Sequence, residues 1–272
     1  MASPQKKFEN SLPGKLNKIM EILIGEPKIV EEGQNRTVFE ISPLYAGYGA
    51  TIGNSLRRVL LSSMEGAAAV KVKIEGVPHE FTTIPGVLED VVDVILNLKR
   101  VRFKLFGVDS AKAVLDSKGE KEIKAGDLKL PTGVEVINPD QLICTVSDKK
   151  AEVNMEIEIE KGIGYVPVEQ RQKEKLSVGE IAIDAIFNPV RKVSLRIENI
   201  RVGDRTDYNK LFLDIETDGS VTPQEVLKRA SWILVEQLKT IGESMILEEA
   251  LVKSADDKPK KKKGRPRKVI SE

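Results

Sequence analysis

The stretch ATIGNSLRRVLLSSMEG, residues 50–66, has two chemically different faces when its residues are placed at helical spacing. One face carries Ile52, Leu56, Val59, Leu60 and Ser63, and the opposite face carries Asn54, Arg57, Arg58 and Leu61. The first face predicts packing against the chain's own core. The second is either an ordinary solvated surface or a protein-contact patch, because arginine keeps its charge, makes forked hydrogen bonds and tolerates partial burial.

A second helix is predicted after the turn at Asp218 and Gly219. Thr222 and Glu225 have the spacing of a capping box, with Pro223 at the first helical position. An apolar stripe at helical spacing follows, made of Val226, Leu227, Ala230, Ile233, Leu234, Leu238, Ile241 and Met245. Trp232 and Val235 fall outside this stripe, so either a partner covers them or the helix is enclosed within its own domain.

Several other segments alternate apolar and polar residues, which is typical of strands that bury one face. They are VKVKIEGV (70–77), EVNMEIEIE (152–160), VSLRIENIRV (193–202) and KLFLDIET (210–217). Sheets with one solvated face are usually antiparallel or mixed. The region from 67 to 189 has many short strands, scattered glycine and proline, and one helix around GVLEDVVDVILNLKR (86–100), which predicts a compact second domain. The predicted fold class is therefore α+β.

Composition limits the possible classes of protein. At 272 residues and 40% hydrophobic content, the chain can bury one large or two modest cores. Cys144 is its single cysteine, so no intramolecular disulfide is possible, and no repeated Cys or His spacing suggests a metal. The N-terminal 28 residues lack a long apolar segment, which predicts neither a secretion signal nor a membrane span. We therefore expect a cytoplasmic protein.

The sequence offers few groups for catalysis. His79 is the single histidine, and no serine or cysteine neighbours it in VPHEF. The glycine stretches GYG (47–49) and GIGY (162–165) are too short for a phosphate-binding loop. We predict no catalytic residue, no metal site and no cofactor in this chain, and an independent enzyme is disfavoured.

Four long motifs together resemble one family, the α subunit of bacterial RNA polymerase. They are YGATIGNSLRRVLLSSMEG (48–66), HEFTTIPGVLEDVVDVILNLK (79–99), GYVPVEQR (164–171) and DRTDYNKLFLDIETDGSVTPQEVLKRASWILVEQL (204–238). The resemblance covers about residues 27–250 in collinear order.

The resemblance implies a domain organisation. A dimerisation domain, with a mixed or antiparallel sheet and two helices, is expected from residues 27–66 and 190–252. A second, mostly β domain at 67–189 interrupts it. Residues 1–26 are an N-terminal extension, and composition alone, with much Lys, Pro and Gly and few apolar residues, predicts a disordered basic tail at 253–272. Such chains form homodimers on which the β and β′ subunits assemble, and those subunits hold the nucleotidyl-transfer site. The protein would then lie in the bacterial cytoplasm, associated with the nucleoid.

The resemblance also implies roles for individual residues. Arg58 matches the family position tied to β binding, and Arg57, Asn54 and Leu61 share its face. HEFTTIPG and DVVDVILNLK lie in regions that the family places toward β, and residues 188–191 lie in a region used for β′. Dimerisation is expected through Ile52, Leu56, Leu60, Leu227, Ile233, Leu234 and Leu238.

The C-terminal segment departs from the family pattern, which continues to a small helical DNA-binding domain. Residues 255–272 instead carry eight Lys or Arg against three Asp or Glu, so they contribute +5 to a total charge of +1. Its core, Lys263, Gly264, Arg265, Pro266 and Arg267, resembles an AT-hook, in which arginines enter a narrow A·T minor groove. Three interpretations stay open: A·T-rich DNA, unspecific phosphate contact, or no DNA role. A rival function is a stand-alone dimeric DNA-architectural protein.

Overall fold

The computed structural model describes residues 25–171, 177 and 179–256, with side chains described up to residue 242. The chain divides after Ser231 into two units. Antiparallel sheets and helices make up the described residues, which confirms the predicted α+β class.

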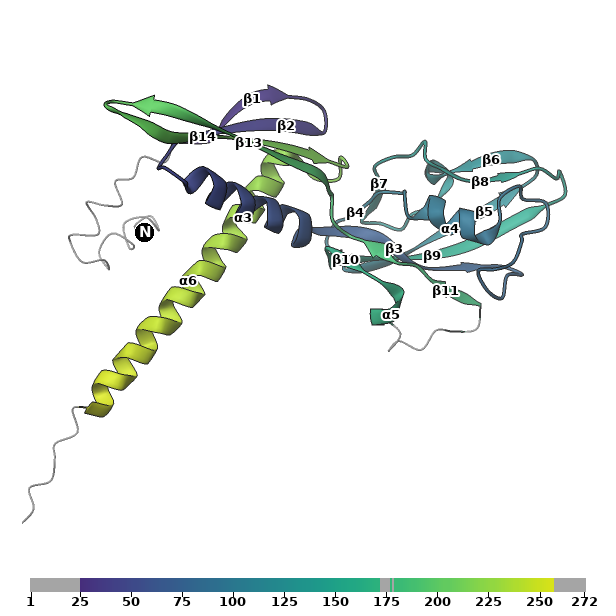
Figure 1. Cartoon of the computed structure of the whole chain (residues 1–272). Coiled ribbons are helices and arrows are strands. Elements are labelled where there is room, and N and C mark those ends of the chain that lie inside the picture. The colour runs from purple at the N-terminus through teal and green to yellow at the C-terminus, as the bar shows by residue number, and fades with distance from the viewer. Residues whose placement is uncertain (1–24, 172–176, 178, 257–272) are drawn as a thin grey trace, which may run out of the picture. The chain divides into compact units, whose positions relative to one another are not determined.

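The first sheet has four antiparallel strands in the order β1-β2-β14-β13 (Figure 1). These strands are β1 (Lys28–Glu32), β2 (Arg36–Leu44), β13 (Val190–Val202) and β14 (Arg205–Thr217). The predicted alternation is confirmed in β14, where Leu211, Leu213 and Ile215 are fully buried. In β13 the burial weakens along the strand, from Val193 in the core to Ile197, which is 39% exposed.

Helix α3 (Tyr48–Ser62) packs against β13 and β14 of this sheet (Figure 1). It ends at Ser62, so Glu65 and Gly66 of the quoted stretch already belong to the next strand. Its inward face matches the prediction: Leu56, Val59 and Leu60 are buried, and Ile52 packs on the sheet core.

The second group of strands lies between β2 and β13 in the sequence. Its main sheet has the order β5-β9-β3-β4-β7, and β11 also pairs with β3. These strands are β3 (Glu65–Ile74), β4 (Phe103–Leu105), β5 (Ser110–Lys118), β7 (Val134–Val136), β9 (Glu152–Ile163) and β11 (Glu180–Ala182). Two small sheets pair β6 (Lys121–Lys124) with β8 (Leu142–Val146) and β10 (Tyr165–Val166) with β12 (Ala185–Ile186). A mostly β region therefore separates the two halves of the four-stranded sheet in the sequence. The domain boundaries expected at residues 67 and 189 stay a prediction.

Three short helices accompany these strands: α4 (Val91–Leu98), the 3-10 helix η1 (Ala125–Asp127) and α5 (Val168–Arg171). Helix α4 is shorter than the expected 86–100 because the Asp90 side chain caps it, accepting a hydrogen bond from the Asp93 amide at 2.8 Å. Val91, Val94 and Leu98 of α4 join one continuous core with strands β3, β5 and β9.

The last helix, α6 (Pro223–Asp256), begins as predicted. The Glu225 amide donates to the Thr222 hydroxyl oxygen at 3.3 Å, and the Thr222 amide donates to the Glu225 carboxylate at 3.4 Å. Val226, Leu227 and Ala230 are buried within the first unit. Within the described part of the chain, no helix is long and apolar enough to cross a membrane.

Candidate docking surface

The outward face of α3 presents the four residues that the sequence grouped together. Asn54, Arg57 and Arg58 are exposed, and Leu61 is 41% exposed. Neither arginine side chain forms an ion pair with a described residue. Two guanidinium groups beside an exposed leucine are thus available to a partner, and their forked donors suit carboxylates.

The N-terminal end of α3 is held by Asn209 of β14. Gly47 precedes the helix with φ +83°, where no side chain of its own can cap the first turn. The Asn209 Oδ1 atom instead accepts hydrogen bonds from the amides of Gly47 at 2.9 Å and Gly49 at 3.3 Å. An asparagine from the sheet therefore satisfies helix amides that have no intrahelical acceptor.

Close approach of α3 to the sheet depends on glycine. A Cβ atom on Gly49 would lie 3.0 Å from the Asn209 Cβ, and one on Gly53 would lie 3.1 Å from a Leu211 methyl carbon. A Cβ at either position would make an unusually tight contact, so a neighbouring side chain on β14 would have to shift. Glycine at these positions thus lets the helix lie close to the sheet.

The C-terminal end of α3 is held by Asn188, which precedes β13. Its side-chain amide donates to the carbonyl oxygens of Leu60 at 3.0 Å and Leu61 at 2.6 Å. The side-chain Oδ1 atom of Asn188 accepts a hydrogen bond from the Val190 amide at 2.8 Å. Residue 188, which the sequence analysis associated with β′, therefore lies against the end of the helix that carries Arg58.

The region around α4 presents a second, apolar surface. Phe81 in the preceding loop is 81% exposed and Leu88 is 76% exposed, while Val92 and Leu96 of α4 are 37% and 46% exposed. The Glu89 carboxylate accepts from the amide and hydroxyl of Thr145 at 2.7 and 2.9 Å, which fixes the segment leading into α4. These four apolar side chains thus lie on an ordered part of the chain and face solvent.

The residues predicted for dimerisation divide into two groups. Leu56, Leu60 and Leu227 are buried in the chain's own core, whereas Ile52, Ile233 and Leu234 are half-buried. Leu238 is 67% exposed, beside the exposed Trp232, Val235 and Ile241 of α6. Within the single chain, α6 therefore leaves a row of large apolar side chains in solvent.

Reactive groups are few in the described residues. No cluster of three or more His, Cys, Asp or Glu residues there could hold a metal ion. Burial, with a smaller effect of Glu89, raises the pKa of the Cys144 thiol to about 12, so it is not a nucleophile at neutral pH. The His79 ring contacts Phe81, with centroids 6.5 Å apart. Lys263, Gly264, Arg265, Pro266 and Arg267 lie outside the described residues.

The role of two asparagines in holding α3 was not predicted from the sequence, although residue 188 had been placed in the region expected to contact β′. Asn209 offered a signal, because it occupies a position in phase with the buried Leu211, Leu213 and Ile215. A polar residue on the apolar face of a strand has to find a hydrogen-bond partner inside the protein. Asn188 lies outside any regular pattern and gave no comparable signal.

The chain is similar in sequence to known proteins. The family described as "RNA polymerase Rpb3/RpoA insert domain" matches residues 72–188. The chain is similar to the DNA-directed RNA polymerase subunit alpha of Roseiflexus sp. (strain RS-1), with 44% identity over 225 residues, 83% of this chain and 69% of the relative. It is also 44% identical to the subunit of the same name from Alkaliphilus oremlandii over 250 residues, 89% of this chain and 78% of the relative.

Proposed function

Because the chain belongs to the family of DNA-directed RNA polymerase α subunits, we propose that it acts by assembly, as a homodimer on which the β and β′ subunits dock. Membership of this family makes the chain a subunit that acts in transcription. We propose in addition that it serves in assembly, that it contacts its partners through the surfaces described below, and that it performs no catalysis itself.

The observation that carries the proposal is the exposed face of α3. Arg57 and Arg58 are exposed on a helix whose two ends are fixed by Asn209 and Asn188. Side chains on a rigid element lose less conformational entropy on binding than those on a mobile loop. We therefore assign this face, with Asn54 and Leu61, to the contact with β.

The apolar surface around α4 supports a second contact with a large subunit. Phe81 and Leu88 are mostly exposed, and large aromatic and aliphatic side chains dominate the binding energy of protein interfaces. We assign the apolar surface around α4 to the contact with the β subunit, which is the role that the family resemblance implies for this region. The segment at residues 188–191 is assigned to β′ in the other copy.

Dimerisation is proposed through the exposed row on α6 together with α3. Trp232, Val235, Leu238 and Ile241 are three residues apart, and such a row runs obliquely, at about 45° to the helix axis. A two-fold axis would make the contact self-complementary, as is usual for homodimers.

Substitution Arg58→Ala tests the assignment of the α3 face. We expect a folded dimer that recovers about tenfold less β in a pull-down, because a central interface arginine often contributes more than about 1.4 kcal/mol. Arg201→Ala, which removes another exposed arginine on β13, is the matched control. Recovery of β at the native yield by the Arg58→Ala dimer would refute the role of Arg58.

A second candidate function is the stand-alone dimeric DNA-architectural protein, favoured by the basic sequence KKKKGRPRK at residues 260–268. It predicts no large partner subunits. Purification of the tagged chain from its own cells at low salt separates the two functions, since the polymerase role requires that β and β′ co-purify in stoichiometric amounts.

A further inference from the structure

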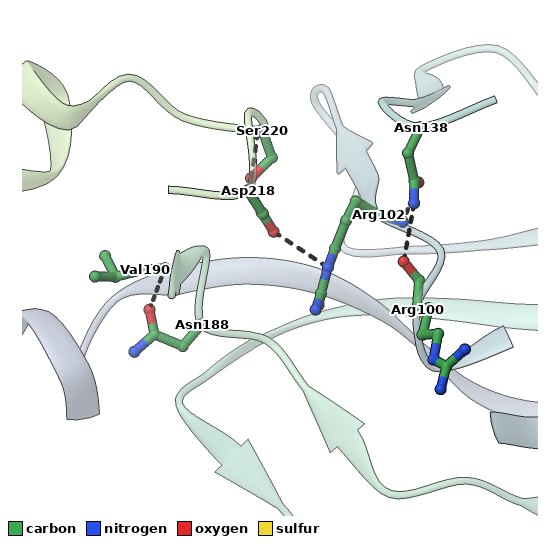
Figure 2. A network of polar contacts seen from close by, with 7 residues as sticks. All are labelled: Arg100, Arg102, Asn138, Asn188, Val190, Asp218 and Ser220. Carbon is green, nitrogen blue, oxygen red and sulfur yellow. Dashed lines mark hydrogen bonds and ion pairs between the residues drawn. The ribbon is translucent and has the colours of Figure 1, made fainter. Parts of the chain in front are cut away.

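One ion pair joins the insert, defined here as residues 72–188, to the end of the four-stranded sheet (Figure 2). The Arg102 Nε atom lies 3.6 Å from the Asp218 Oδ2 atom. Arg102 precedes β4 in the insert, and Asp218 follows the last residue of β14. Both side chains are largely removed from solvent, with 18% and 6% of their surface exposed.

Asp218 is fixed on the side of the sheet. Its Oδ1 atom accepts hydrogen bonds from the Ser220 amide at 3.0 Å and the Ser220 hydroxyl at 2.6 Å. Its own amide donates to the Pro189 carbonyl at 2.9 Å. The carboxylate is therefore oriented by the turn, which leaves its other oxygen directed at Arg102 (Figure 2).

The backbone of Arg102 is held on the side of the insert. Its amide donates to the Asn138 Oδ1 atom at 2.7 Å, and the Asn138 side-chain amide donates to the Arg100 carbonyl at 2.9 Å (Figure 2). The Ile137 amide donates to the Arg102 carbonyl at 2.9 Å. The ion pair thus joins a carboxylate oriented by its turn to an arginine whose backbone is held by hydrogen bonds within the insert.

The Arg102 guanidinium depends on Asp218 for charge compensation. Burial lowers the pKa of Arg102, Asp218 raises it, and Arg191 lowers it further. The Nε atom is buried and has no hydrogen-bond partner among the described residues. Removal of the Asp218 charge would leave a largely buried cation without its counter-charge, which is strongly unfavourable.

Strand pairing among the described residues does not continue across the same seam. No described strand of the four-stranded sheet pairs with a strand of the insert. A cavity of about 150 Å³ lies at the seam, lined by residues that include Ala67, Phe103, Ser220 and Arg229. Beside Asp218 the two sides come close, since a Cβ on Gly219 would lie 3.3 Å from an Ile137 methyl carbon. The ion pair therefore lies where the two sides meet tightly, and the hydrogen bonds from Asn188 to Leu60 and Leu61 mark a second such place.

We propose that Arg102 and Asp218 form a positioning pair that holds the insert in one orientation relative to the four-stranded sheet. The pair thereby keeps the α3 face, on the sheet, and the apolar surface around α4, in the insert, aligned for the same large partner. The second statement rests on the proposed docking function, whereas the first concerns the free chain.

The orientation of the insert is measurable with spin labels in the absence of any partner. Nitroxides on Glu120→Cys in the insert and Glu198→Cys in β13 report one distance by double electron–electron resonance. The single native cysteine, Cys144, is fully buried and will not compete for label. Labelled chain is mixed with excess unlabelled chain, so that dimers carry one labelled copy.

We expect a narrow distance distribution in the native sequence and a broad or shifted one in Asp218→Asn. Arg102→Gln is the second single variant, and Arg102→Gln with Asp218→Asn removes both charges together. The double variant should be more thermostable than Asp218→Asn alone, because it no longer buries an uncompensated cation. Asp214→Asn, which breaks the Arg36–Asp214 ion pair inside the sheet, is the matched control and should leave the distribution narrow.

Binding of β to the same variants separates this proposal from the docking function. We expect Asp218→Asn to bind β about tenfold more weakly with the broadened distribution, and Arg58→Ala to bind weakly with the native distribution. An unchanged distribution in both Asp218→Asn and Arg102→Gln would overturn the positioning role, whatever happens to β. A broadened distribution with native β affinity would instead overturn the alignment of the two surfaces.

Discussion

The side-chain amide of Asn188 donates to the Leu60 carbonyl oxygen at 3.0 Å, although 128 residues separate the two in the chain. Asn209 makes the equivalent connection at the other end of α3, where it accepts from the Gly47 amide. Both ends of the helix are therefore tied to the sheet by asparagine side chains. These hydrogen bonds hold the helix backbone, and they thereby determine which way the positions of Arg57 and Arg58 face.

Substitution Asn188→Ala is expected to lower the free energy of unfolding by about 1–3 kcal/mol, because two helix carbonyls lose their donor. It should also weaken β recruitment, since the last turn of α3 carries Leu61. Denaturant unfolding and a β pull-down measure the two effects. Asn154→Ala is the control, because the Asn154 side-chain amide also donates a hydrogen bond, to the Glu75 carboxylate at 2.7 Å, but in β9, away from both proposed β-contact surfaces. Equal effects of both variants on β recruitment would contradict the role given to Asn188.

The sequence predicted the fold where a pattern is local. The alternation in residues 152–160 predicted a strand with Val153, Met155, Ile157 and Ile159 inside, and all four are buried in β9. The capping box at Thr222 was visible for the same reason, since its two hydrogen bonds span three residues. Local periodicity and capping require no knowledge of the rest of the chain.

The candidate site was only partly predictable from the sequence. The exposed face of α3 was predicted, because helical spacing alone separates Arg58 from Leu56. The Asn188–Leu60 and Arg102–Asp218 contacts join residues more than a hundred positions apart, and no periodicity relates such residues. The interface roles of Leu56 and Leu60 stay a prediction, although both side chains are already buried against the sheet in the single chain.

Substitution Leu238→Glu is expected to convert the dimer to monomer. A carboxylate in the middle of the exposed row on α6 would have to lose its hydration at an apolar interface. Light scattering coupled to size-exclusion chromatography measures the mass. Gln237→Glu places the same carboxylate one residue away, on an exposed polar position, and should leave the dimer intact. A dimeric Leu238→Glu chain at micromolar concentration would exclude this row from the interface.

Cys144 is expected to react with a thiol reagent only when the chain unfolds. Its side chain is fully buried, and its pKa is raised from 9.0 to about 12, mainly by burial. The reaction rate with Ellman's reagent at pH 8 should be negligible in buffer and rise across the urea unfolding transition. Rapid labelling under native conditions would contradict the buried position of the thiol.

The same raised pKa predicts a dependence of stability on pH. The folded chain holds the thiol proton more tightly than the unfolded chain, so this contribution is fully present below pH 9 and is lost as pH rises toward 12. Cys144→Ala should therefore flatten the decline of unfolding free energy across this alkaline range, as measured by urea titrations at successive pH values. An identical decline in the variant would assign it to other groups.

Deletion of residues 258–268 is expected to weaken binding of the dimer to A·T-rich duplex DNA at low salt. The deletion removes eight lysines and arginines, so the slope of log affinity against log salt should also fall, by about 0.9 for each phosphate that the shortened chain leaves unneutralised. The double substitution Arg265→Lys with Arg267→Lys separates the two modes of binding, because it keeps the charge but removes the side chains that prefer a narrow minor groove. If the segment recognises the minor groove, the double variant should lose its preference for A·T-rich over G·C-rich DNA and keep the salt slope. If the double variant binds both duplexes as the native chain does, the segment binds phosphates only. Unchanged DNA binding after the deletion would show that the segment has no role in DNA binding.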